Sequence, residues 1–230
     1  MYSRKTVEQA KGEMSAEAEY RRHSRMRVVA TALVLVIFQL PLGHLVHGEN
    51  LAAQAGREAI FWALTLVLVV YILLIERRPL SSIGLKRPTW KSVVFGLISA
   101  FVMVGGSVII YLVVFPALGL QANEGGLQVL QSMPLWFQTA LIVRAAVFEE
   151  LYYRGFAIER LTEITGFGWI ASLISLAAFT FAHLSYWGWA SLIAVAFEGA
   201  ILTGLYLFRR DLASNMIAHL FANVASFLLL

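Results

Sequence analysis

A set of charged and polar side chains lies within segments of this sequence that are otherwise apolar. They are Arg144, Glu149, Glu150, Arg154, His183, Glu198, His219 and Asn223. Charged side chains at membrane depth are rare and indicate functional sites, because inserting one costs about 2.5–3.5 kcal/mol. A carboxylate and a neutral histidine can take the proton of a water molecule that attacks a carbonyl. A second histidine and an amide can stabilise the oxyanion. These residue types therefore indicate acyl transfer to water.

Helical spacing divides these residues into pairs. Glu150 and Arg154 are four residues apart, so on a helix they share one face and can form an ion pair. Glu149 is rotated by roughly 100° from Glu150 and is therefore the freer carboxylate. Two further pairs with the same spacing are Phe179 with His183 and His219 with Asn223. Spacing assigns no partner to Arg144, and we expect Glu198 to be structural or to line the site from a distance.

The composition indicates an integral membrane protein. Of 230 residues, 59% are hydrophobic and 14% are charged, whereas soluble domains average about 45–50% apolar and about 25% charged residues. Cysteine is absent, which excludes disulfides, iron–sulfur clusters, thiolate zinc sites and a cysteine nucleophile. The net charge of +4 arises from Lys and Arg between apolar runs. That pattern is typical of membrane topology signals and not of nucleic-acid binding.

The apolar stretches predict an all-α, polytopic membrane protein with about seven transmembrane helices in one bundle. Lys and Arg alternate between successive connections, so the positive-inside rule predicts a cytoplasmic N-terminus. We expect the polar first 27 residues to form a cytoplasmic tail. The predicted spans are 28–47, 58–75, 92–118, 134–160, 167–184, 188–208 and 212–229.

The levels of the polar residues in the membrane can be counted from the expected turns. If one hairpin turns at Thr165-Gly166, Glu149 and His183 lie roughly 21 and 24 Å above it. If the last hairpin turns at Arg210-Asp211, His219 lies about 12 Å above that turn and Asn223 about 6 Å higher. We therefore expect these side chains to converge on a cavity that is reached from the cytoplasm.

Three motifs occur in order on successive predicted helices: Glu149-Glu150-x-x-x-Arg154, Phe179-x-x-x-His183 and His219-x-x-x-Asn223. Together they resemble the CPBP family of type II CaaX prenyl endopeptidases, bacteriocin-processing proteins and Abi-domain proteins. The resemblance covers roughly residues 130–230. It implies an intramembrane glutamic protease in which Glu149 and His183 activate water, His219 and Asn223 form the oxyanion hole, and Glu150 and Arg154 support the site.

This interpretation divides the chain into the polar tail 1–27, N-terminal transmembrane helices at 28–120, and a CPBP/Abi-like catalytic core at 121–230. The expected partners are a peptide or protein substrate, lipidated in the CaaX form of the reaction, and membrane lipid. We expect no nucleic acid and no cofactor. The expected location is the plasma (cell inner) membrane, with the active site opening to the cytoplasm.

Other functions are compatible with the same residues. Glu149, His183 and His219 are also a ligand set for zinc, although no HExxH motif is present. A non-proteolytic scaffold, immunity or regulatory protein could use the same fold. A transporter is less favoured, because the last four predicted helices show neither an inverted repeat nor a pair of broken helices.

Overall fold

The computed structural model describes residues 28–40, 42–122 and 125–229. These residues form helices and no strand, so the predicted all-α fold is confirmed for them. The chain divides into two compact units, Met1–Leu40 and Pro41–Leu230. In the first unit the structure describes the helix Val28–Gln39. The predicted tail, residues 1–27, lies outside the described residues.

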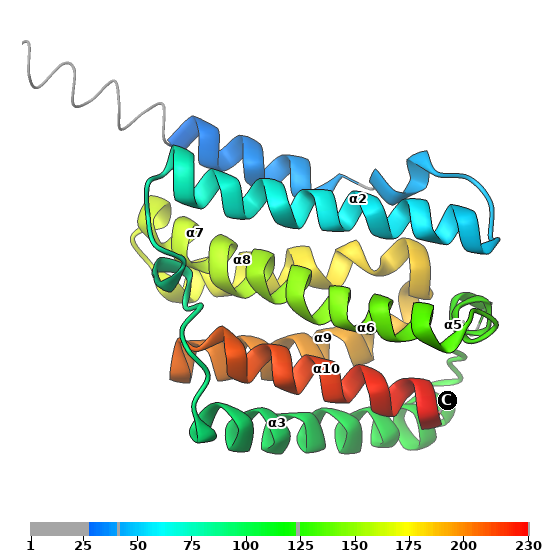
Figure 1. Ribbon diagram of the computed structural model, residues 1–230. Coiled ribbons are helices and arrows are strands. Elements are labelled where there is room, and N and C mark those ends of the chain that lie inside the picture. Colours follow the sequence, from blue (N-terminus) through cyan, green and yellow to red (C-terminus); the bar gives the residue numbers. More distant parts are fainter. Residues whose placement is uncertain (1–27, 41, 123–124, 230) are drawn as a thin grey trace, which may run out of the picture. The chain divides into compact units, whose positions relative to one another are not determined.

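The second unit contains the helices labelled in Figure 1. Three of its helical stretches, Leu51–Ile75, Trp90–Leu118 and Leu184–Arg209, are long and apolar enough to cross a membrane. In chain order the elements are η1 (Leu42–Leu45), α2 (Leu51–Val70), η2 (Tyr71–Ile75), η3 (Leu80–Ile83), α3 (Trp90–Ile109), η4 (Ile110–Val114), α4 (Phe115–Leu118), α5 (Gly125–Gln131), α6 (Leu135–Glu149), η5 (Glu150–Ala157), α7 (Ile158–Thr165), α8 (Gly168–Ala182), α9 (Leu184–Arg209) and α10 (Leu212–Leu229).

The helices leave large apolar side chains on the outside. Phe101 is 81% exposed and Leu112 is 72% exposed, and both belong to the stretch Trp90–Leu118. Apolar surface of this kind is what a lipid environment covers, because lipid tails are as apolar as these side chains. A count of seven spans and a cytoplasmic N-terminus stay predictions.

Two of the differences between the helix boundaries and the predicted spans have a local cause in the sequence. The predicted span 28–47 contains the helix Val28–Gln39 and the separate 3₁₀ turn η1, since proline at position 41 disfavours helical backbone in the residue before it. The predicted span 58–75 begins earlier, at Leu51, because the Asn50 side chain accepts a hydrogen bond from the N–H of Ala53 at 2.9 Å and caps the helix. The two predicted turns are confirmed: α7 ends at Thr165 with Gly166 in the left-handed region, and α10 follows α9 after Arg210 and Asp211.

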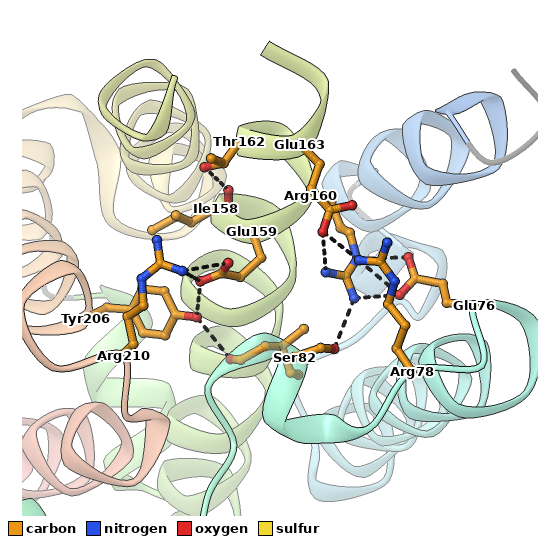
Figure 2. A network of polar contacts seen from close by, with 11 residues as sticks. Glu76, Arg78, Ser82, Ile158, Glu159, Arg160, Thr162, Glu163, Tyr206 and Arg210 are labelled. Atoms are coloured by element: carbon orange, nitrogen blue, oxygen red, sulfur yellow. Dashed lines mark hydrogen bonds and ion pairs between the residues drawn. The ribbon is translucent and has the colours of Figure 1, made fainter. Parts of the chain in front are cut away.

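The segment between α2 and α3 is attached to α7 and α9 by buried polar contacts (Figure 2). Arg160 is 2% exposed and donates to both carboxylate oxygens of Glu76, at 2.6–3.0 Å. The Tyr206 hydroxyl lies 2.8 Å from Glu159 and 3.1 Å from the carbonyl oxygen of Ile83. These contacts, together with an ion pair between Arg210 and Glu159, bring the basic connection after α2, α7 and the α9–α10 turn to one end of the unit.

Helices α3 and α10 lie side by side and begin at this same end (Figure 1). Asp211 precedes α10 and accepts hydrogen bonds from Ser92 of α3 at 2.7 Å, from Ser214 at 2.8 Å and from the N–H of Ala213 at 3.1 Å. Burial alone would raise the pKa of Asp211, but these hydrogen bonds and the nearby Arg209 outweigh it and lower the pKa. Asp211 therefore joins the starts of α3 and α10 as an ionised group.

Gly84 lies where the segment after η3 approaches α9 closely, and a substitution there tests how tight this contact is. Its φ is 79°, and a Cβ atom there would lie 2.9 Å from Cε2 of Tyr206. Gly84→Ala should lower the free energy of unfolding by about 1–2 kcal/mol for the left-handed backbone and by about 1–3 kcal/mol more for the overlap. Gly119→Ala is the control, since Gly119 has φ 65° and open space around it. Equal losses for both variants, measured by SDS titration of the purified protein, would show that the overlap costs nothing.

Asp211 makes stability depend on pH in the acid range. Because its folded pKa is lowered, its contribution is complete above the unfolded pKa, about 3.9, and is lost as pH falls through the folded value. Asp211→Asn should therefore lower the thermal midpoint at neutral pH, and its difference from the unsubstituted protein should shrink below about pH 4. A difference that stays constant from pH 7 to pH 3 would contradict this assignment.

Candidate active site

Glu150 is a fully buried carboxylate with three side-chain partners. Arg154 donates to its Oε1 at 3.0 Å, so the predicted ion pair is present. His219 donates to the same oxygen through Nδ1 at 2.8 Å, and Asn215 donates to Oε2 at 3.1 Å. The carboxylate is 0% exposed, so these partners replace the water that would otherwise solvate its charge.

Glu150 begins the π-helix η5, in which every residue from Glu150 to Ala157 is buried. Hydrogen bonds from residue i to i+5 give a π-helix a wider turn than an α-helix, and such segments occur frequently at functional sites. The wider turn keeps side chains four residues apart close in direction, which suits the pair Glu150–Arg154.

The second nitrogen of Arg154 extends this network to α9. Its Nη2 donates to the carbonyl oxygen of Gly199 at 3.2 Å, and its guanidinium group lies over the ring of Phe179 at 4.1 Å. A Cβ on Gly199 would come within 2.9 Å of the Phe179 ring, so glycine permits this close approach of α8 and α9. Phe179 also contacts the His183 ring, with centroids 4.7 Å apart, and thereby links the charged pair to the histidine.

Glu149 has a different environment from its neighbour Glu150. Its Oε1 lies 3.5 Å from Nη1 of Arg144. Its Oε2 is buried, has no hydrogen-bond partner among the described residues, and lies 3.6 Å from Nε2 of His183 and 3.9 Å from Nε2 of His219. Separations of this size between polar atoms are too long for direct hydrogen bonds and fit a bridging water or substrate atom.

The remaining hydrogen bonds determine which nitrogen of each histidine carries a proton. Nδ1 of His183 lies 2.8 Å from the carbonyl oxygen of Phe179, which can only accept. Nδ1 of His219 faces the Glu150 carboxylate, which also accepts when it is ionised. Both Nδ1 atoms are therefore donors, and in a neutral ring each Nε2 presents a lone pair towards Glu149.

The structure brings Glu149, Glu150, Arg154, His183 and His219 together. Asn223 lies on α10, one turn beyond His219, and within the described part of the chain no hydrogen bond or ion pair joins it to this cluster. Glu198 accepts a hydrogen bond from Ser107 of α3 at 2.6 Å, which agrees with the structural role expected for it.

Two site residues were missed by the sequence reasoning. Asn215 is four residues before His219, and this spacing, which places it on the same face of α10, was the available signal. Glu58 on α2 is the partner that spacing could not assign to Arg144, since the two residues lie on different helices.

Residues 131–225 match the family model described as type II CAAX prenyl endopeptidase Rce1-like. Residues 131–225 form an Rce1-like segment. The match confirms the resemblance that the three motifs carry, and the segment contains all of them. The family is one of endopeptidases and of membrane proteins. No curated protein and no solved structure matches the chain.

The Rce1-like segment can be tested for a metal site. Glu149, His183 and His219 have side chains of the kinds that bind zinc. In both histidines Nδ1 donates to an oxygen atom, as it does in many metal-bound imidazoles. Among the described residues, however, no group of three or more His, Cys, Asp or Glu side chains has an arrangement that could hold a metal ion. The reaction proposed for this cluster therefore uses the side chains alone.

The two glutamates should differ in their contribution to stability. Arg154→Ala leaves the Glu150 carboxylate without its counter-ion, and breaking such a buried pair costs about 3–5 kcal/mol. Glu149→Gln removes one long contact at 3.5 Å and should cost less than about 1.5 kcal/mol. SDS titration followed by circular dichroism measures both losses. A loss for Glu149→Gln as large as that for Arg154→Ala would refute the division between them.

Proposed function

We propose that this chain is an intramembrane endopeptidase of the glutamic type. The observation that carries the proposal is the arrangement around Oε2 of Glu149, a buried carboxylate oxygen that faces Nε2 of His183 and Nε2 of His219 at 3.6 and 3.9 Å. The match to a family of endopeptidases supports the reaction class.

In the first step, a water molecule between Glu149 and His183 donates its hydrogens to Oε2 and to Nε2. Its oxygen lone pair attacks the carbonyl carbon of the peptide bond, and one proton passes to this carboxylate–imidazole pair. When the tetrahedral intermediate collapses, the C–N bond breaks and the same proton goes to the leaving amine. The acid product and the amine product then account for all atoms of the water.

His219 supplies the proton donor for the developing oxyanion. The cluster contains the carboxylates of Glu58, Glu149 and Glu150 and the guanidinium ions of Arg144 and Arg154, so three negative charges face two positive ones. A proton on Nε2 of His219 balances the remaining charge, because Nδ1 already donates to Glu150. This N–H group then stabilises the oxyanion, and in the proposal Asn223 supplies a second donor from the next turn of α10.

The proposed substrate is a peptide that is prenylated or otherwise associated with the membrane, as in CaaX processing. Its support is the description of the family that residues 131–225 match. The proposed location is the plasma membrane, with the site reached from the cytoplasm. This side is supported by the counted depth of Glu149 and by the Lys and Arg residues that follow α2 and α9.

Glu149→Gln tests the proposed base. The full chain, purified in lipid nanodiscs, is given an internally quenched peptide with a farnesylated CaaX terminus and the same peptide without the lipid. Because the amide has little basicity, the variant should lose at least about 10²-fold in kcat, the lower range for general base catalysis, while its thermal midpoint changes little. His183→Gln should cause a similar loss in kcat with little change in the thermal midpoint.

Glu163→Gln serves as the matched control, since Glu163 pairs with Arg78 and Arg160 at the end of α7 and has no contact with the site.

Cleavage should persist in EDTA, and loss of cleavage in EDTA with recovery on adding Zn²⁺ would establish the metal-dependent alternative. Unchanged cleavage by Glu149→Gln would refute its role as base. If neither peptide is cleaved and Glu149→Ala keeps the host phenotype, a scaffold or immunity role replaces the protease.

A further inference from the structure

Arg144 is a nearly buried cation between two carboxylates. Its side chain is 10% exposed, and its Nε and Nη2 donate to the two oxygens of Glu58 at 2.8 and 2.9 Å. The remaining nitrogen, Nη1, points to Oε1 of Glu149 at 3.5 Å. A two-pronged contact of this kind fixes the plane of a guanidinium group as well as its position.

The partner of Arg144 comes from α2, outside the Rce1-like segment 131–225. Glu58 lies seven residues after the start of α2 at Leu51, and Arg144 nine residues after the start of α6 at Leu135, which corresponds to depths of about 10 and 14 Å along the two helices. The pair is thus inside the unit and not at a helix end.

Aromatic contacts support the same geometry. Phe61, one turn after Glu58, lies under the Arg144 guanidinium group at 4.5 Å. Phe61 also contacts Phe148, with ring centroids 5.4 Å apart, and Phe148 directly precedes Glu149. The guanidinium group is therefore held by a carboxylate and an aromatic ring of α2 while it reaches the reacting carboxylate on α6.

This arrangement makes the two oxygens of Glu149 unequal. Oε1 faces Arg144, and Oε2 faces both histidines. The last torsion of a glutamate side chain has a broad, nearly twofold preference, so a donor on one side is needed to fix the direction of the other oxygen. The contact from Arg144 is longer than its contacts to Glu58, and Glu149 thus remains only weakly paired.

We propose that the ion pair between Glu58 and Arg144 is a positioning element for Glu149. Arg144 directs Oε2 towards His183 and His219. Glu58 limits the contact between Arg144 and Glu149. Without Glu58 the guanidinium group would form a full ion pair with Glu149 and turn the Glu149 carboxylate away from the histidines. The effect on cleavage rests on the proposed function, whereas the effect on the orientation of Glu149 does not.

The orientation is tested by NMR of the full chain in nanodiscs with ¹⁵N-labelled histidine. The chain has five histidines, so His183→Gln and His219→Gln assign the relevant signals. Arg144→Gln and Glu58→Gln should each shift the Nε2 resonances of both histidines. Arg160→Gln is the matched control, because Arg160 is also buried and donates through Nε and Nη2 to the two carboxylate oxygens of Glu76. It should leave these resonances unchanged.

The effect on the reaction is measured with the farnesylated quenched peptide. Arg144→Gln should lower kcat by about 10²-fold, the loss that a small misplacement of a reacting group causes, with KM within about twofold. The double variant Glu58→Arg/Arg144→Glu separates positioning from structure. It rebuilds an ion pair between α2 and α6 and should recover thermal stability, but it places a carboxylate beside Glu149 and should leave kcat low.

Each result decides between the two roles. Unshifted Nε2 resonances in Arg144→Gln, or wild-type cleavage by the exchanged double variant, would overturn the inference and leave a purely structural ion pair. If the unsubstituted protein cleaves neither the farnesylated nor the lipid-free peptide, the proposed function fails. In that case the histidine resonances still decide whether Arg144 orients Glu149.

Discussion

Glu150 carries a carboxylate that is removed from solvent, and Arg154, His219 and Asn215 all donate to it. These donors come from η5 and α10, and Arg154 and Asn215 also donate to carbonyl oxygens of α9, at Gly199 and Leu202. A buried carboxylate without such donors would cost several kcal/mol. The segments around the site therefore have one arrangement in which this charge is satisfied, and that arrangement determines where His219 directs its second nitrogen.

Two neighbouring glutamates thus have opposite environments. Both oxygens of Glu150 are engaged, while Oε2 of Glu149 has none of the described residues as a hydrogen-bond partner. The difference follows from their consecutive positions, since adjacent residues on a helix point in different directions. A buried group that is fully hydrogen-bonded stabilises the fold, and a buried group that is left without a partner can act on a substrate.

Local spacing predicted the part of the site that depends on single helices. The pair Glu150–Arg154 could be predicted because the interaction stays within one turn, and the hairpin turns because Gly166 and the Arg210-Asp211 step interrupt apolar runs. The π-helix was not predicted, since an i+5 pattern has no distinct signature in a short buried segment. Glu58 was missed because its contact with Arg144 spans 86 positions of the chain, and no periodicity connects residues on separate helices.

The contacts between segments before and after residue 120 have a common physical cause. An intramembrane charge needs a partner at its own depth, and that partner can belong to any helix that packs against it. Arg144 finds Glu58 on α2, and Glu198 finds Ser107 on α3. At the end of the unit, outside the apolar stretches, Asp211 likewise finds Ser92 at the start of α3. The Rce1-like segment therefore contains the groups proposed to react, while helices outside it supply the partners that its remaining charged side chains require. A site of this kind is best treated as a property of the whole unit Pro41–Leu230 and not of its matched segment alone.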